Sequence, residues 1–161
     1  MITNDEFIKM LTFEQDVVLR LTSDLSQADS LLQPEPAGNC LNWVLGHLSV
    51  NLIDMITALD GELPADLLGL DRYLYGSDPI LGEGPGVLKV QQLLDTYAQL
   101  THTLTGRLET MSSADFDEEI DYWQGKYRRG YVAFFYFFHH TYHIGQLEQL
   151  RNLAGRTEKV I

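Results

Sequence analysis

The sequence predicts an all-α protein, a four-helix bundle formed by one domain that spans residues 1–161. Apolar residues recur at steps of three and four in four long segments, which is the spacing of one helical face. Stretches rich in proline and glycine separate these segments, and no segment shows a convincing strand pattern. Hydrophobic residues make up 45% of the chain, which is enough to fill one sizeable core.

The first helix is predicted from its capping residues and from the prolines that follow it. Thr3 and Glu6 are spaced as a capping box, in which each side chain satisfies a free N–H group at a helix start. Pro34 and Pro36 cannot continue a helix, so this element is expected to end by about Leu32. Its apolar face consists of Phe7, Met10, Leu11, Val17, Val18, Leu21, Leu25 and Ala28.

The second helix is expected to begin within residues 39–42 and to end before Gly61 and Pro64. The connection after it, residues 62–86, contains three prolines and five glycines and has no helical period. A connection this long in a small domain is usually functional or mobile. Only a short helical turn near residues 65–70 is expected in it. The buried stripe of the second helix is Leu41, Val44, Leu45, Leu48, Leu52, Met55 and Leu59.

The third and fourth helices have the longest regular patterns. The third repeats apolar residues at nearly heptad spacing from Leu93 to Met111. Polar residues 117–130 follow and predict either a loop or a short hairpin. The fourth helix is expected from about Tyr131 to Ala154, with Gly155 as its stop. Aromatic residues favour strands, but the steps of three and four that continue after the aromatic block favour a helix.

Charge and cysteine content exclude some classes of function. The chain has 23 acidic and 11 basic side chains and a formal net charge of -12, so neither nucleic acid nor a membrane is an expected partner. The single cysteine, Cys40, rules out an intramolecular disulfide. No apolar run approaches the roughly 20 residues that cross a bilayer. The first residues lack a signal-peptide pattern, and a cytoplasmic location is therefore expected.

Three histidines carry the candidate chemistry. His139 and His143 are four residues apart, so both imidazoles lie on the face of the fourth helix that points into the bundle. His47 lies at the edge of the apolar stripe of the second helix, and the bundle topology allows it to face that pair. Three neutral imidazoles can hold one divalent metal ion and leave positions open for water or substrate. The alternative is that these histidines are core residues with satisfied hydrogen bonds.

Four more residues are candidates for the pocket or for contacts with the ligands. Asn51 and Asp54 continue the line of His47 and predict a polar cavity beside this helix, although Asp54 also fits a solvated surface position. Tyr136 lies one turn before the histidine pair and either lines the pocket or is a buried tyrosine with a satisfied hydroxyl. Gln146 either bonds a histidine or a metal-bound water, or serves helix packing or solvent contact.

Several other residues receive structural roles. His140 and His102 are given no metal role, and Trp43 is expected to anchor the core rather than to contact substrate. Cys40 is expected to be a small buried filler, and Gly145 is expected to allow a close helix approach. The aromatic residues 131–138 cover all sides of the fourth helix. A helix that is apolar all round is buried on all sides, which predicts a homodimer.

Two segments, taken together, resemble the DinB-like family, also described as YfiT-like metal-dependent hydrolases. They are Asn42-Trp-Val-Leu-Gly-His47-Leu and, far along the chain, His139-His-Thr-Tyr-His143-Ile-Gly-Gln146. The segment Tyr75-Gly-Ser-Asp-Pro-Ile80 adds to the likeness, which covers nearly the whole chain. The resemblance implies an up-down-down-up bundle that is often dimeric. It also implies that His47, His139 and His143 bind nickel, zinc or iron.

The resemblance leaves two classes of function open. The first is an enzyme with a small-molecule substrate, either a metal-dependent hydrolase or a thiol-dependent S-transferase that uses a low-molecular-weight thiol. The second is a non-catalytic metal-binding or stress-response protein in which the ion is structural or sensory. No catalytic acid or base can be matched to the family. The chain has no Glu-x-x-His, His-Glu-x-x-His or phosphate-loop motif, which excludes di-iron carboxylate, metalloprotease and nucleotide-binding readings.

Overall fold

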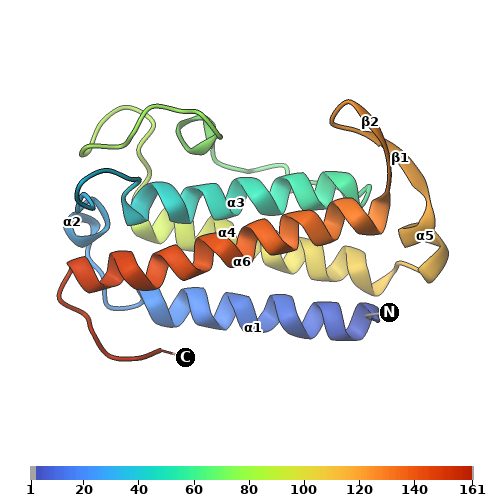
Figure 1. The fold of residues 1–161 in the computed structure, drawn as a ribbon, viewed down its shortest axis with the longest axis horizontal. Helices are drawn as coiled ribbons and strands as arrows, with labels where there is room; N and C mark the ends of the chain where they lie inside the picture. Colours follow the sequence, from blue (N-terminus) through green and yellow to red (C-terminus); the bar gives the residue numbers. More distant parts are fainter. Residues whose placement is uncertain (1–2, 161) are drawn as a thin grey trace.

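The computed structural model describes residues 3–160 as a helical bundle with a small hairpin at one end (Figure 1). The long helices are α1 (Asn4–Thr22), α3 (Leu41–Ala58), α4 (Val90–Glu109) and α6 (Arg129–Leu153). The short ones are α2 (Gln27–Ser30), the 3-10 helix η1 (Asp71–Tyr73) and α5 (Ser113–Asp117). Strands β1 (Glu119–Tyr122) and β2 (Gly125–Arg128) pair in antiparallel fashion, with Glu119 opposite Arg128.

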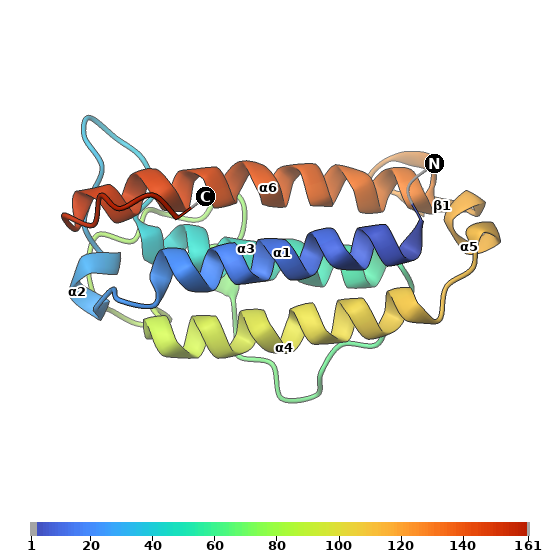
Figure 2. The ribbon, with the colours of Figure 1, turned by 90° about the horizontal axis from the view of Figure 1, so that it is seen from below.

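The four long helices run up, down, down and up, as Figures 1 and 2 show. Helices α3 and α4 are parallel because the long connection between them returns along the bundle before α4 begins. Both α1 and α3 pack against α4 and α6, which puts α1 and α3 at opposite corners. The predicted all-α bundle is confirmed. No helix within residues 3–160 combines the length and the apolar character needed to cross a membrane.

The apolar faces of the four long helices meet in one continuous core. Each helix contributes side chains with no exposed surface, such as Val18, Leu45, Leu100 and Leu147. Burying a side chain of this size stabilises the fold by about 1.5–3 kcal/mol. The steps of three and four in the sequence therefore correspond to the faces that are removed from water.

The first predicted helix consists of two elements, so the expectation that it reaches Leu32 is wrong. Helix α1 ends at Thr22, and the N–H group of Ser23 makes its last bond to the helix. Ser26 and Asp29 then form a capping box that starts α2. A serine at this position offers its oxygen to a free N–H group, which favours a new helix start over continuation of the old one.

The remaining boundaries differ little from the prediction. Residues 117–130 contain a hairpin, which was one of the two expected forms, and α6 begins at Arg129 rather than at Tyr131. Gly155 has a φ of 74° just after α6, which suits its predicted role as a stop. In the long connection, the helical turn is η1 at residues 71–73 and not at 65–70.

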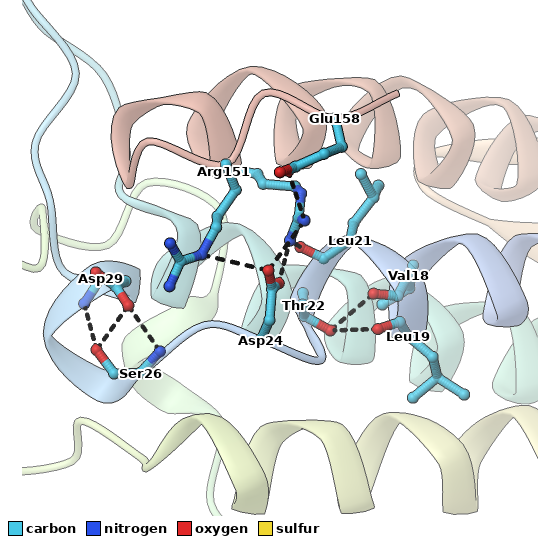
Figure 3. A network of polar contacts seen from close by, with 10 residues as sticks. Val18, Leu19, Leu21, Thr22, Asp24, Ser26, Asp29, Arg151 and Glu158 are labelled. Carbon is cyan, nitrogen blue, oxygen red and sulfur yellow. Dashed lines mark hydrogen bonds and ion pairs between the residues drawn. The ribbon is translucent and has the colours of Figure 1, made fainter. Parts of the chain in front are cut away.

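A polar network joins the end of α6 to the end of α1 (Figure 3). The buried guanidinium of Arg151 donates to the Leu21 carbonyl at 3.2 Å and pairs with the Asp24 carboxylate. A second carboxylate, that of Glu158, lies 3.7 Å from Arg151. This network fixes the position of the last turns of α6, the helix that carries two of the three candidate ligands.

Candidate metal centre

The three predicted histidines come together where α3 packs against α6. The Nε2 atom of His139 lies 3.0 Å from Nε2 of His143 and 3.3 Å from Nε2 of His47. The three candidate ligand nitrogens all lie within 4.8 Å of one another. Nitrogens that share one ion at bond lengths of about 2.0–2.1 Å and ordinary bond angles are about 3.0–3.4 Å apart. The two Nε2 separations therefore suit a shared ion.

Hydrogen bonds to the far side of two rings determine which nitrogen faces the centre. Nδ1 of His47 lies 2.7 Å from the Tyr73 carbonyl oxygen, and Nδ1 of His143 lies 2.8 Å from Oε1 of Gln146. Because these oxygens only accept, each Nδ1 carries the proton and each Nε2 keeps its lone pair. Hydrogen bonding among the rings cannot satisfy both lone pairs, since the single Nε2–H that His139 can offer points to one neighbour only. The donor set therefore fits a divalent cation.

The site keeps its imidazoles uncharged. Burial lowers the pKa of His47, His139 and His143, and the pKa of His143 falls to about 4. The neighbouring rings add to this effect, because two positive charges in one small site repel each other. Neutral imidazole is the form that binds a metal, so the three rings need not lose a proton at neutral pH.

Gly46 explains how α3 presents His47. A Cβ atom on Gly46 would lie 2.1 Å from Cδ1 of Tyr73, so only glycine leaves room for that ring. The Tyr73 hydroxyl donates to Oδ1 of Asn42 at 3.1 Å and accepts from the Leu88 N–H group at 2.7 Å. These contacts hold η1 against α3 and bring the Tyr73 carbonyl to the His47 ring. Gly46 and Asn42 thus help to orient the His47 ring through their contacts with Tyr73.

Trp43 forms one wall of the site. Its ring stacks on the His47 imidazole with centroids 4.6 Å apart and planes at 19°. Its indole N–H donates to Oγ of Ser77 at 2.9 Å, and this contact ties the long connection to α3. Trp43 is buried as expected, but it also lines the pocket beside the histidines, so its predicted role as a core anchor is incomplete.

A pocket of about 740 Å³ lies beside the three histidines. This volume is within the range of roughly 300–1,000 Å³ that is typical of small-molecule sites. Two connections contribute to its walls, residues 34–39 before α3 and residues 75–77 before α4. The last turns of α6 also line the pocket, from Tyr142 to Leu153. Part of the long proline- and glycine-rich connection therefore shapes the pocket.

The four additional candidates are not all near the pocket. Gln146 lines it and contacts His143. The Asn51 amide donates to the backbone carbonyl of His47 at 3.1 Å, within its own helix. The Tyr136 hydroxyl accepts from the Tyr122 hydroxyl at 3.0 Å. Asp54 is half-buried, and burial raises its pKa while a hydrogen bond from Tyr136 opposes that rise. Asn51, Asp54 and Tyr136 are not among the residues that line this pocket.

The remaining structural expectations have mixed outcomes. His102 is exposed and Cys40 is fully buried, both as predicted, and burial raises the pKa of the Cys40 thiol. The expectation for Gly145 is wrong, because within residues 3–160 a Cβ atom there would meet no atom of another element within 4 Å. It therefore allows no close helix approach.

One buried polar cluster was not anticipated. His140 is 1% exposed, and its Nδ1 atom lies 3.0 Å from Oε2 of Glu14 in α1. The Thr141 hydroxyl donates to Oε1 of the same carboxylate at 2.5 Å. The Tyr97 ring of α4 stacks on the His140 imidazole, with planes at 8°. His140 therefore faces α1 and α4, away from its neighbour His139, and fixes the rotation of α6 about its own axis.

The fold and the site together define a class of protein, an up-down-down-up bundle with three histidines clustered between its second and fourth long helices. The family model described as the DinB superfamily matches residues 10–147. The chain therefore belongs to the DinB superfamily.

Solved structures give the same architecture. The chain is similar to a conserved protein from Enterococcus faecalis, with a TM-score of 0.69 and 15% sequence identity. The match covers 95% of this chain and 97% of that one. At this identity the likeness concerns the fold alone. No curated protein shows a significant sequence match to this chain.

Proposed function

We propose that the chain binds one divalent metal ion through Nε2 of His47, His139 and His143 and acts as an enzyme on a small molecule. The proposed reaction is hydrolysis or the transfer of a low-molecular-weight thiol. The observation that carries the proposal is the convergence of three imidazole nitrogens at the wall of a pocket of about 740 Å³. Three protein ligands leave at least one position of a divalent ion for water, thiol or substrate.

A bound ion would supply Lewis acidity and lower the pKa of a water or thiol that it holds. The residues of this chain have supporting tasks. The Tyr73 carbonyl and the Gln146 amide oxygen keep two rings in the tautomer that offers Nε2. Trp43 covers one face of the His47 ring, which limits the access of bulk water from that side. Nickel, zinc and iron all accept imidazole nitrogen, so the ligand set alone does not select among them.

The second candidate is a non-catalytic metal-binding or stress-response protein. An ion held by His47 from α3 and by the histidine pair from α6 would link two helices, and a link of this kind stabilises a bundle. The open pocket favours the enzyme, because a structural or sensory site needs no space for a substrate. The coordination of the bound metal discriminates between the two, since a closed shell would favour the structural role.

We also propose that the protein is a cytoplasmic homodimer. Tyr131, Phe134 and Phe138 are spaced by three and four residues on α6, and each is more than half exposed. A contiguous aromatic stripe of this kind is typical of a surface that a partner covers. Light scattering at micromolar concentration tests the dimer, and a monomer under those conditions would contradict it. The single buried thiol, Cys40, fits a reducing compartment.

The test of the metal site is calorimetric titration of chelator-treated protein with nickel, zinc and anaerobic ferrous iron, followed by elemental analysis. We expect one equivalent of metal per chain and no measurable binding by the His143→Ala variant at micromolar metal. The His102→Ala variant is the matched control, because His102 is exposed and lies on α4, which carries none of the three ligands. Equal metal affinity of the unchanged protein and of both variants would overturn the proposal.

The test of the activity uses the metal-loaded protein. Hydrolysis of activated esters and amides is screened beside the transfer of small thiols to electrophilic acceptors. Activity that depends on metal and is lost in His143→Ala would support the enzyme. Stoichiometric metal binding with a closed coordination shell and no activity would favour the structural role.

A further inference from the structure

The walls of the metal pocket carry very little charge. Among the lining residues within the described range 3–160, Glu35 is the one charged side chain, and none is lysine or arginine. The other polar groups of the walls are neutral, and three of them are the amides of Asn39, Gln146 and Gln149. The rest of the lining is mainly aromatic or aliphatic. This composition differs from that of a site that binds carboxylates or phosphates, where arginine and lysine are expected.

The nearby arginines are directed elsewhere. Arg151 follows a lining residue, Leu150, but its guanidinium turns toward α1 and pairs with Asp24 (Figure 3). The guanidinium of Arg72, in the long connection, donates to the Pro79 carbonyl at 3.4 Å. The formal net charge of -12 adds a negative background to the site. A bound metal ion would therefore be the main positive charge that a ligand meets there.

This arrangement disfavours the binding of an anionic ligand. A carboxylate or phosphate outside the coordination shell would lose its water without gaining a positively charged partner. The Glu35 carboxylate would also repel it. An uncharged ligand meets amide donors and acceptors, and an aromatic ring can stack on the exposed Tyr75 and Tyr142 side chains at the pocket walls. A cation gains from the same aromatic faces and from Glu35.

We infer that this pocket selects uncharged or positively charged polar molecules with an aromatic or amide group and rejects those that carry carboxylate or phosphate. The inference rests on the proposed function, because it treats the pocket beside the three histidines as the substrate site. It names a substrate class that neither the fold nor the family membership specifies. Gln149 is the position where the selection can be changed, since it is exposed, lines the pocket and belongs to the rigid helix α6.

The test uses the cobalt-loaded protein and three aromatic thiols of the same shape. They are 4-mercaptobenzamide, which is uncharged, 4-mercaptobenzoate, which is anionic, and 4-(aminomethyl)thiophenol, which is cationic. The charged group is opposite the sulfur, so it cannot coordinate the same ion. The thiolate-to-cobalt absorption band reports binding directly, without any turnover. We expect the amide and the amine to bind about tenfold more tightly than the benzoate, which is the size of effect that one charge contact has when solvent largely screens it, as it does at the exposed Glu35 side chain.

Two variants at one position provide the control. Gln149→Lys places a positive charge at the wall and is expected to bring the benzoate within about threefold of the amide or to reverse the order. Gln149→Met changes the side chain without adding charge and is expected to keep the preference of the unchanged protein. Both variants must bind one equivalent of cobalt, since neither alters a histidine.

The outcomes separate this inference from the proposed function. If the unchanged protein does not bind cobalt, the metal site itself is disproved. If it binds one equivalent of cobalt and the three thiols bind with equal affinity, only the charge selection is disproved. Bound cobalt whose spectrum none of the thiols changes would also overturn the inference, because the pocket would then not admit aromatic ligands.

Discussion

The Glu14 carboxylate of α1 holds the His140 imidazole of α6 at 3.0 Å in the centre of the bundle. Both side chains are buried, and Thr141 donates to the second oxygen of the same carboxylate. This contact lies next to the candidate ligand His139 but on the other side of α6. The helix is therefore held by one polar contact toward α1 while it offers its histidine pair to α3.

Removing Glu14 should destabilise the fold. The Glu14→Ala variant leaves the buried His140 donor without its acceptor, whereas the exposed Thr141 hydroxyl can still donate to the Phe137 carbonyl. We therefore expect a loss of about 1–3 kcal/mol in the free energy of unfolding. Urea denaturation followed by circular dichroism measures this loss. Glu62→Ala is the control, because Glu62 is exposed in a connection and its removal should change stability by less than about 0.5 kcal/mol. Equal midpoints for both variants would contradict the prediction.

Gly46→Ala should disturb both the fold and the metal site. The added methyl group would collide with the Tyr73 ring, and overpacking of this kind costs about 1–3 kcal/mol. Tyr73 carries the carbonyl that orients His47, so metal affinity is expected to fall as well. Thermal unfolding and calorimetric titration with zinc measure the two effects.

Gly145→Ala is the matched control for that substitution, because both glycines lie inside helices. A Cβ atom on Gly145 meets nothing within 4 Å, and alanine is the better helix former by about 1 kcal/mol. This variant should be as stable as the unchanged protein or more stable, with the same zinc affinity. A similar loss in both variants would show that the Tyr73 contact is not the cause.

Gln146 should matter for metal affinity more than for stability. The Gln146→Leu variant removes the acceptor that fixes the tautomer of His143, and loss of such a partner weakens metal binding by about 10–100-fold. Zinc titration by calorimetry gives the dissociation constant. Gln149→Leu is the control, since Gln149 also lines the pocket on α6. If both variants bind zinc like the unchanged protein, the hydrogen bond has no role in binding.

The contact between Asp24 and Arg151 should make stability depend on pH on the acid side. The Arg151 guanidinium lowers the pKa of the Asp24 carboxyl in the folded state. The carboxylate therefore contributes its full stabilisation above its unfolded-state pKa of about 3.9 and loses it as the pH falls through the lower folded-state value. The difference in unfolding free energy between the unchanged protein and Asp24→Asn should be constant from neutral pH to about pH 5 and shrink below about pH 4. A difference that does not change with pH would contradict this.

The sequence predicted the helices well because their periodicity is a local property. The spacing of His139 and His143 also specified a shared face, since positions four apart on a helix always align. The meeting of His47 with that pair depended on topology, which is a property of the whole chain. The early end of α1 could have been recognised, because Ser26 and Asp29 are spaced as a capping box.

The missed residues depend on contacts between distant segments. Glu14 occupies a position on the apolar stripe of α1, and an acidic residue there is a signal that sequence analysis could have used. Its partner on α6 could not be known from either helix alone. Asp54 does continue the polar ridge of α3, but the space beside it is filled by Tyr136, whose hydroxyl bonds to Tyr122 of the hairpin. A pattern within one helix cannot show what another element places against it.

Binding of the proposed ion would be coupled to docking of the connection between α3 and α4. Tyr73 supplies the acceptor for His47, and Ser77 accepts the Trp43 N–H group, so docking of this segment and alignment of the first ligand are one event. Because such coupling is reciprocal, a change that destabilises the docked segment would lower the affinity for the ion. Binding of the ion would in turn stabilise the docked segment by the same free energy. Hydrogen exchange of the backbone amides in residues 70–78 would thus slow when the proposed metal site at His47 is occupied.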